Sequence, residues 1–298
     1  SRAVPATYSG LVQIAPGDWH TLGLRWDGTV VAWGQNFYGQ ATVPDGLTNV
    51  VALAGGGQHS LALRADGSVV AWGRNNLGQT SVPGGLPAAQ AISAGSDFSV
   101  ALLADGHVAV WGSNANGQLA VPASLGSARQ VDAGFAHVIA LRTDGQVVCW
   151  GDNGFGQCNV PANLGPVTAV AAGDLHSLAI RADGSVVCWG NNSVGQSTPP
   201  AGLKNVVKID AGFRNSVALT ADGTIVAWGE GGASLTPPDS FHHATQISAG
   251  GFAVYAIKNL EDADGDLVDD SFEITNHLNP QNADTDGDGL SDGLERLY

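Results

Sequence analysis

The residues best placed for chemistry are acidic and lie near the C-terminal end of the sequence. Asp284 to Glu295 reads DTDGDGLSDGLE, a twelve-residue loop with carboxylates at positions 1, 3, 5, 9 and 12 and a glycine at position 6. Ca²⁺ takes six to eight oxygen ligands, and a glycine there permits the sharp turn that gathers them. The predicted ligands are the side chains of Asp284, Asp286, Asp288, Asp292 and Glu295 and the carbonyl of Leu290.

A second acidic loop begins 22 residues earlier and repeats this spacing. Leu267 replaces its glycine, so we expect weaker calcium affinity there. Its predicted ligands are Asp262, Asp264, Asp266, Asp270, Glu273 and the carbonyl of Val268. The stretch 279–295 resembles the thrombospondin type 3 calcium repeats of bacterial surface and secreted proteins, and an EF-hand or dockerin loop is similar locally. The resemblance implies a calcium-stiffened linker and an extracellular or cell-surface location. The alternative is a solvated acidic tail.

Charge divides the chain near Leu260. Residues 261–298 hold 12 of the 27 Asp and Glu residues and one basic residue, which gives a net charge of −11 and leaves −4 for residues 1–260. We therefore expect one folded domain over 1–260 and a calcium-binding linker over 261–298. Only 12 Lys and Arg residues are present, which argues against a nucleic-acid partner. No apolar run approaches the roughly 20 residues of a membrane helix.

The first 260 residues repeat with a period of 39, as the Trp-Gly pairs show at Trp33, Trp72, Trp111, Trp150, Trp189 and Trp228. In the unit 50–88, strands are predicted over Val50–Ala54, His59–Leu63 and Ser68–Trp72, with an Asp-Gly hairpin before the last. Three short strands cannot bury both faces of a sheet, so the units must stack. Radial stacking gives a β-propeller, whereas a linear solenoid would need two caps.

Whether the ring closes depends on its last unit. Units begin at residues 11, 50, 89, 128, 167, 206 and 245, and the seventh breaks off after Leu260. Residues 1–10 match the end of a unit, so the two pieces leave one strand missing. That strand comes either from upstream of Ser1 or from 263–268, which also form part of a calcium loop. We expect an all-β, seven-bladed propeller with three-stranded blades and an incomplete last blade.

The segment His59 to Pro83 reads HSLALRADGSVVAWGRNNLGQTSVP. This segment and its copies resemble the repeats of the regulator of chromosome condensation family, over residues 1 to about 260. The short period is similar to that of its bacterial branch, typified by β-lactamase inhibitory protein II. The resemblance implies a propeller with seven three-stranded blades. It does not carry over the nuclear GTPase partner of the chromosomal member, because nothing in this sequence suggests a nucleus.

Strand direction predicts which loops share a face. The Gly-x-x-His and Asn-x-x-Gly loops should lie on one face and the Asp-Gly turns on the other. The x-x pairs differ in every copy, and varied side chains on a constant scaffold are what recognition requires. Some of these rings could instead fill gaps between blades. The predicted partner-binding residues are Asp18, Trp19, Phe37, Tyr38, Asp97, Phe135, Phe155, Asp174, Phe213, Arg214 and Phe252.

No nucleophile elbow, paired-carboxylate motif or phosphate-binding loop stands out, and the repeated histidines are expected to pack inside the blades. An enzyme would bring acids, or a histidine and an acid, together at one pocket. Cys158 could form a disulfide with a neighbouring cysteine, but we favour buried free thiols for Cys149, Cys158 and Cys188.

These patterns predict a non-enzymatic extracellular module that binds a protein or glycan ligand on its loop face. We expect a monomeric propeller within a longer surface protein. The alternatives are a β-lactamase inhibitor and a carbohydrate-binding or glycan-active protein.

Overall fold

The computed structural model describes residues 10–231, 244–251, 253–258 and 284. Six antiparallel sheets of three strands follow one another along the chain, and we number them blades 1 to 6. Their strands are β1 (Leu11–Pro16), β2 (His20–Arg25), β3 (Val30–Gly34), β4 (Val50–Gly55), β5 (His59–Arg64), β6 (Val69–Gly73), β7 (Ala89–Ala94), β8 (Phe98–Leu103), β9 (Val108–Gly112), β10 (Ala128–Ala133), β11 (His137–Arg142), β12 (Val147–Gly151), β13 (Val167–Ala172), β14 (His176–Arg181), β15 (Val186–Gly190), β16 (Val206–Ala211), β17 (Asn215–Thr220) and β18 (Ile225–Gly229).

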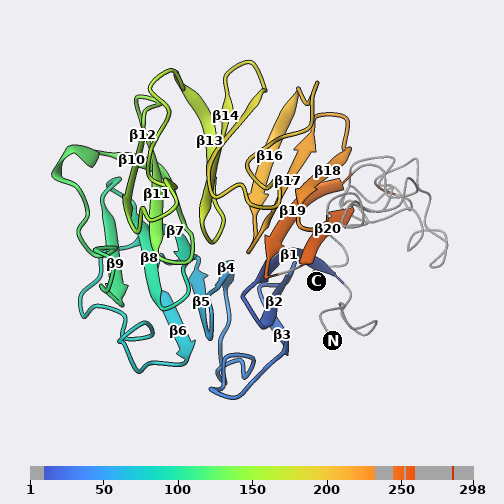
Figure 1. Cartoon of the computed structure of the whole chain (residues 1–298). Helices are drawn as coiled ribbons and strands as arrows, with labels where there is room; N and C mark the ends of the chain where they lie inside the picture. Colours follow the sequence, from blue (N-terminus) through green and yellow to red (C-terminus); the bar gives the residue numbers. More distant parts are fainter. Residues whose placement is uncertain (1–9, 232–243, 252, 259–283, 285–298) are drawn as a thin grey trace.

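A seventh sheet of two strands, β19 (Ala244–Gly250) and β20 (Ala253–Lys258), returns beside β1 and brings the last sheet against the first (Figure 1). Tyr255 packs with Ile14 and Trp33 of blade 1, and its hydroxyl lies 3.3 Å from Thr21 Oγ1. The all-β propeller and its three-stranded blades are therefore confirmed for six blades. The segments predicted to complete the seventh blade, 1–10 and 263–268, lie outside the described residues apart from Gly10.

The apolar core lies between neighbouring blades. In the first interface, Leu22 and Leu24 of blade 1 pack against Leu53 and Trp72 of blade 2. Trp72 Nε1 donates to the Gln40 carbonyl, 3.0 Å away, in the connector between the two blades. The equivalent bond recurs for Trp111, Trp150, Trp189 and Trp228 at 2.8–3.0 Å. The repeated tryptophan thus ties each of blades 2 to 6 to the connector that precedes it.

The repeated histidines are buried in the same interfaces, as the sequence predicts. His59 Nε2 lies 3.0 Å from Ser99 Oγ of the next blade, and Ser99 Oγ donates to the Gln79 carbonyl. The serine hydrogen is therefore used, so His59 must donate through Nε2. Burial lowers the pKa of His59 to about 3, so the ring is neutral at pH 7. Three further pairs repeat this contact: His20–Ser60, His137–Ser177 and His176–Ser216.

The cysteines correct the prediction of three free thiols. Cys149 in β12 and Cys158 in the following connector form a disulfide, with their Cα atoms 5.0 Å apart. The connector turns back over β12 after Gly156, which brings the two residues together. Cys188 occupies the position of Cys149 in the next blade and is free, and burial raises the pKa of its thiol to about 12. Ser197 stands where a second Cys158 would be needed.

Candidate functional site

The two sets of variable loops lie at the same end of the ring. The backbone N–H of Gln35, which follows β3, donates to the carbonyl of Trp19 in the β1–β2 loop at 2.9 Å, and the five other blades repeat this bond. The Asp-Gly turns close the opposite ends of the strands, where Asp27 Oδ1 accepts the N–H of Thr29. The predicted division into a loop face and a turn face is confirmed.

The loops that follow β3, β6, β9, β12 and β15 are each held by a buried glutamine. Gln40 Oε1 accepts the N–H of Tyr38 at 2.9 Å, and Gln157 Oε1 accepts the N–H of Phe155 at 2.9 Å. Gln79, Gln118 and Gln196 make the same bond in their own loops. The scaffold therefore fixes the backbone of the variable residue and leaves its side chain to differ from blade to blade.

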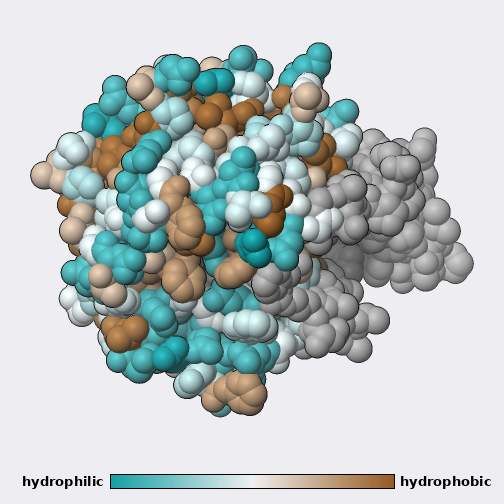
Figure 2. Space-filling model, in the orientation of Figure 1, coloured by the Kyte–Doolittle hydropathy of each residue, from teal (hydrophilic) through white to brown (hydrophobic). Residues whose placement is uncertain are grey.

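Several large side chains of the loop face are exposed rather than packed between blades. Phe37 is 81% exposed and Trp19 is 52% exposed. About half of each of the side chains of Tyr38, Leu77, Phe135 and Phe155 is exposed as well. Phe213 is half-buried, and Phe252 lies outside the described residues. Figure 2 shows apolar side chains as separate patches, with hydrophilic surface between them, on the side of the molecule drawn. That the exposed residues bind a partner stays a prediction.

The two residues between the glycine and the histidine of each Gly-x-x-His loop lie in different places. The sequence does not distinguish these two positions. The first residue of the pair lines the central channel, as Asp18, Phe135 and Asp174 do. The second lies beside the loop that follows its own outer strand. Arg214 shows this arrangement, because its Nε lies 3.2 Å from Glu230 Oε2. The predicted partner-binding residues therefore belong to a channel mouth and to an outer rim.

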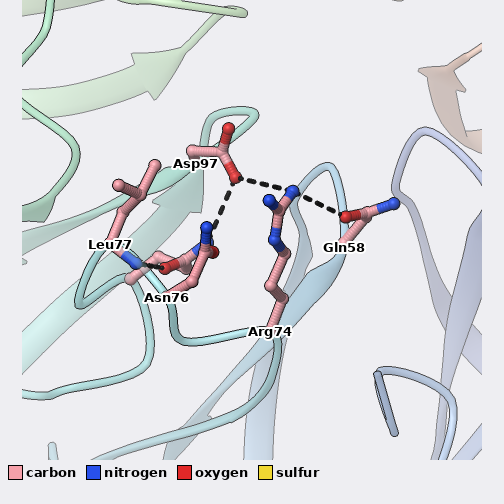
Figure 3. A network of polar contacts seen from close by, with 6 residues as sticks. Gln58, Arg74, Asn76, Leu77 and Asp97 are labelled. Carbon is pink, nitrogen blue, oxygen red and sulfur yellow. Dashed lines mark hydrogen bonds and ion pairs between the residues drawn. The ribbon is translucent and has the colours of Figure 1, made fainter. Parts of the chain in front are cut away.

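On the outer rim, Arg74 contacts the loops of three blades, and Figure 3 shows its contacts with Gln58 and Asp97. Its guanidinium donates to Gln58 Oε1 at 2.8 Å, lies 3.8 Å from Asp97 Oδ1 and stands over the Tyr38 ring at 5.3 Å. Gln79 Nε2 also donates to Asp97, at 3.1 Å. Asp97 thus positions Arg74 and Gln79. Sequence reasoning missed Arg74, because only the fold shows that it reaches two other blades.

The central channel forms a cavity of about 240 Å³ lined by the inner strands and their loops. Four carboxyl groups line it: Asp18, Asp132, Asp174 and Asp210. Asp132 accepts hydrogen bonds from the Ala172 N–H and from Ser93 Oγ, each at 2.8 Å. Asp210 accepts the N–H of Ala249 at 2.8 Å. These two carboxylates therefore tie neighbouring blades together.

The channel raises the pKa of its carboxyl groups. Burial raises the pKa of Asp132. Burial, and then the charge of Asp132, raises the pKa of Asp210 to about 7. Burial, and then the charge of Asp18, raises the pKa of Asp174 to about 7. No repeat pattern points to Asp132 and Asp210, since the equivalent positions of the other units hold alanine or serine.

Comparison with known proteins identifies the repeat. Six segments match the model of the regulator of chromosome condensation (RCC1) repeat, at residues 11–40, 50–79, 89–118, 128–157, 167–196 and 206–233. The chain belongs to the RCC1-repeat family. No curated protein matches it by sequence.

Solved structures show the same fold as this RCC1-repeat propeller. Prp20p from Saccharomyces cerevisiae is 21% identical, with a TM-score of 0.71 over 92% of this chain and 87% of that one. Human WBSCR16 is 19% identical, with a TM-score of 0.69 over 83% and 87%. The CRINKLY WD40 ectodomain of the Arabidopsis thaliana receptor kinase ACR4 is 20% identical, with a TM-score of 0.66 over 83% and 93%. At these identities the likeness establishes the fold alone.

The carboxyl groups that gather in the channel of the RCC1-repeat propeller form the arrangement that an enzyme would show. Asp132 and Asp210, however, accept hydrogen bonds from backbone N–H groups. The four histidines of the blades contact serines inside the interfaces, where neither partner reaches solvent. In the described part of the chain, no group of three or more His, Cys, Asp or Glu side chains is arranged to hold a metal ion.

The calcium-loop residues lie outside the described residues, with the exception of Asp284. Their ligand roles stay predictions from spacing. Within the described residues, no helix is long and apolar enough to span a bilayer.

Proposed function

We propose that this RCC1-repeat propeller is a non-enzymatic recognition module that binds a protein partner through its loop face. The observation that carries the proposal is the exposure of large side chains at the variable loop positions, on backbones fixed by buried glutamines. Exposed aromatic residues are frequent anchors of protein interfaces. Prp20p, which has the same fold, binds Gsp1p and histones, and this supports a protein as the class of ligand.

The proposed location is the cell surface or the extracellular space. The Cys149–Cys158 disulfide supports it, because disulfides persist in oxidising compartments. β-Lactamases are one class of partner for such a surface, since the short repeat resembles that of an inhibitor of these enzymes. A panel of purified β-lactamases, other secreted proteins and polysaccharides would identify the partner, and binding to polysaccharides alone would overturn the protein-binding proposal.

The aromatic rim can be tested with two tryptophans of equal exposure. Trp19 on the loop face is 52% exposed, and Trp26 beside an Asp-Gly turn is 51% exposed. We expect Trp19→Ala to weaken binding of the protein found in the panel by at least roughly tenfold, which is the usual effect of losing an interface anchor. Trp26→Ala should change affinity less than about twofold. Surface plasmon resonance measures both, and equal losses would contradict recognition through the loop face.

We also propose that residues 261–298 form a calcium-bound spacer. The carboxylate spacing of the loop 284–295 supports it, and Asp288 and Glu295 supply two of the expected ligands. Isothermal titration calorimetry should show that the whole chain binds calcium. The double variant Asp288→Ala, Glu295→Ala should lose the binding at this loop. EDTA should leave the tryptophan fluorescence of the propeller unchanged. Unfolding of the propeller in EDTA, or calcium binding that survives in the variant unchanged, would refute the spacer.

A further inference from the structure

Among the described residues, the mouth of the central channel has carboxyl groups but no basic side chain to balance them. Asp18 and Asp174 lie on its loops, and Asp132 and Asp210 lie on the inner strands below. No lysine, arginine or histidine is among the described residues that line the cavity. A hollow with carboxylates on its walls and low-dielectric protein around it concentrates its field and attracts a cation.

Asp174 differs from the carboxylates deeper in the channel. Asp132 and Asp210 accept hydrogen bonds from backbone N–H groups and serine hydroxyls. In contrast, Asp174 Oδ2 is buried and has no hydrogen-bond partner in the described structure. Buried polar atoms are nearly always paired, so an orphan acceptor on a cavity wall indicates a donor that the isolated chain lacks.

The loop that contacts the backbone of Asp174 carries an aromatic residue, Phe135. The backbone N–H of Phe135 donates to the carbonyl of Asp174 at 3.2 Å, so the two loops are in direct contact. Phe135 also lines the cavity, and its side chain is about half exposed. An aromatic face beside a carboxylate suits a guanidinium, which stacks on rings and donates through a planar fork.

We propose that the channel mouth receives an arginine side chain of the protein partner, held by Asp174 and stacked on Phe135. This inference rests on the proposed protein-recognition function and names the residue type that the partner presents. Arginine fits better than lysine, because the guanidinium donates in two directions while it stacks. The apolar rim around the channel then contacts the surface that surrounds this arginine.

The probe for this site is the peptide acetyl-Gly-Arg-Gly-amide, titrated into the whole chain and followed by ¹⁵N NMR. We expect fast-exchange shifts at Phe135 and Asp174, and binding at least tenfold weaker for the citrulline peptide, which keeps the shape without the charge. Asp174→Asn should lose the arginine binding by at least roughly tenfold, since a charged donor loses its charged acceptor. Glu230→Gln removes a loop-face carboxylate outside the cavity and should leave binding unchanged.

The pH dependence gives a second readout. Burial and Asp18 raise the pKa of Asp174 to about 7, so its charge is lost as the pH falls through that value. Asp18, Asp132 and Asp210 are the other titratable groups that line the cavity. The arginine peptide should therefore bind more weakly at about pH 6 than at about pH 8. Asp174→Asn should reduce this dependence.

Three results would overturn the inference: equal binding of the arginine and citrulline peptides, no effect of Asp174→Asn, or preferential binding of Ca²⁺ at Asp174. If Asp174→Asn does not fold, Phe135→Leu supplies the test, because it removes the stacking face and should weaken the arginine peptide several-fold. The arginine site can fail this test while the proposed function still holds. Loss of partner binding in Trp19→Ala, with no peptide binding in the native chain, would leave rim recognition standing and remove only the arginine site.

Discussion

Replacing Gly134 with alanine should destabilise the propeller by about 3 kcal/mol or more, the upper part of the range for overpacking a tight site. A Cβ atom on Gly134 would lie 2.2 Å from the Gly173 carbonyl oxygen and 2.3 Å from His137 Cε1. The first contact belongs to the backbone of the next blade, which cannot move without opening the interface. Urea unfolding followed by tryptophan fluorescence measures the loss.

Gly84 provides the matched control. Nothing lies within 4 Å of a Cβ added there, and its backbone is not in the left-handed region. Gly84→Ala should be neutral or stabilise the protein by about 0.4–1 kcal/mol, because alanine restricts the unfolded chain. Equal losses at the two positions would show that contact between blades is not the reason for the repeated glycine.

The same contact explains why glycine recurs at this position in the repeat. A Cβ on Gly17 would lie 2.3 Å from the Gly56 carbonyl oxygen, and one on Gly56 would lie 2.7 Å from the Gly95 carbonyl oxygen. The sequence shows the 39-residue recurrence, but not its cause. Turn propensity is the obvious interpretation, whereas the structure shows a limit on how closely successive blades approach.

Strands and faces were predictable because six copies of the repeat carry the same signal. The observed strands β4, β5 and β6 lie within one residue of those predicted for the unit 50–88. The shared face of the two loop sets followed from strand direction alone. Both predictions depend on local patterns, which each copy of the unit reinforces.

Features that occur once were not predictable in this way. The contacts of Arg74 with Tyr38 and Asp97 of other blades and the channel position of Asp132 depend on packing between distant segments. The seventh sheet keeps the register of blade 6 but follows it at a spacing of 38 residues instead of 39. Asp210 pairs with Val217 in blade 6, and Ser248 pairs with Tyr255 in the seventh sheet. Tyr255 also contacts blade 1, which no pattern within a unit can specify.

Acid should begin to destabilise the propeller near pH 6.5, well above the pH at which its carboxylates titrate in the unfolded chain. Burial lowers the pKa of His20 and His137 to about 4 and that of His59 and His176 to about 3. The unfolded chain therefore binds protons at these histidines from about pH 6.5 downward, while the folded chain does not. Their contribution to stability is complete above pH 6.5 and is lost as the pH falls toward 4.

The channel carboxyl groups act in the opposite direction. Burial raises the pKa of Asp132, Asp174 and Asp210, so these groups stabilise the fold as the pH falls, and for Asp174 and Asp210 this begins near pH 7. Four histidines take up protons on unfolding and at most three carboxyl groups release them, so the net uptake is at least about one proton. We expect maximal stability near pH 6.5 and a loss of about 1.4 kcal/mol per pH unit below it. Urea midpoints measured from about pH 7.5 to 4 would test this, and rising midpoints would contradict it.

One interface of the native chain lacks the histidine–serine pair and so shows what can replace it. In the interface between blades 3 and 4, Phe98 and Val138 occupy the positions of a histidine and its serine, and both are fully buried in an apolar cluster. A Cβ on Gly95 would meet the Phe98 ring, just as one on Gly56 would meet the ring of His59, so the two rings fill equivalent space. The double substitution His59→Phe, Ser99→Val copies this natural pair into the neighbouring interface.

At neutral pH the double variant should match the native chain within about 1 kcal/mol, because both partners of a buried hydrogen bond are replaced together. Ser99→Val alone should cost about 1–3 kcal/mol, since it leaves the buried His59 N–H without an acceptor. Near pH 4 the double variant should exceed the native chain by about 3 kcal/mol, the linkage contribution of one histidine whose pKa falls from 6.5 to about 3. If the double variant and the native chain lose stability equally in acid, the proton uptake does not arise at His59.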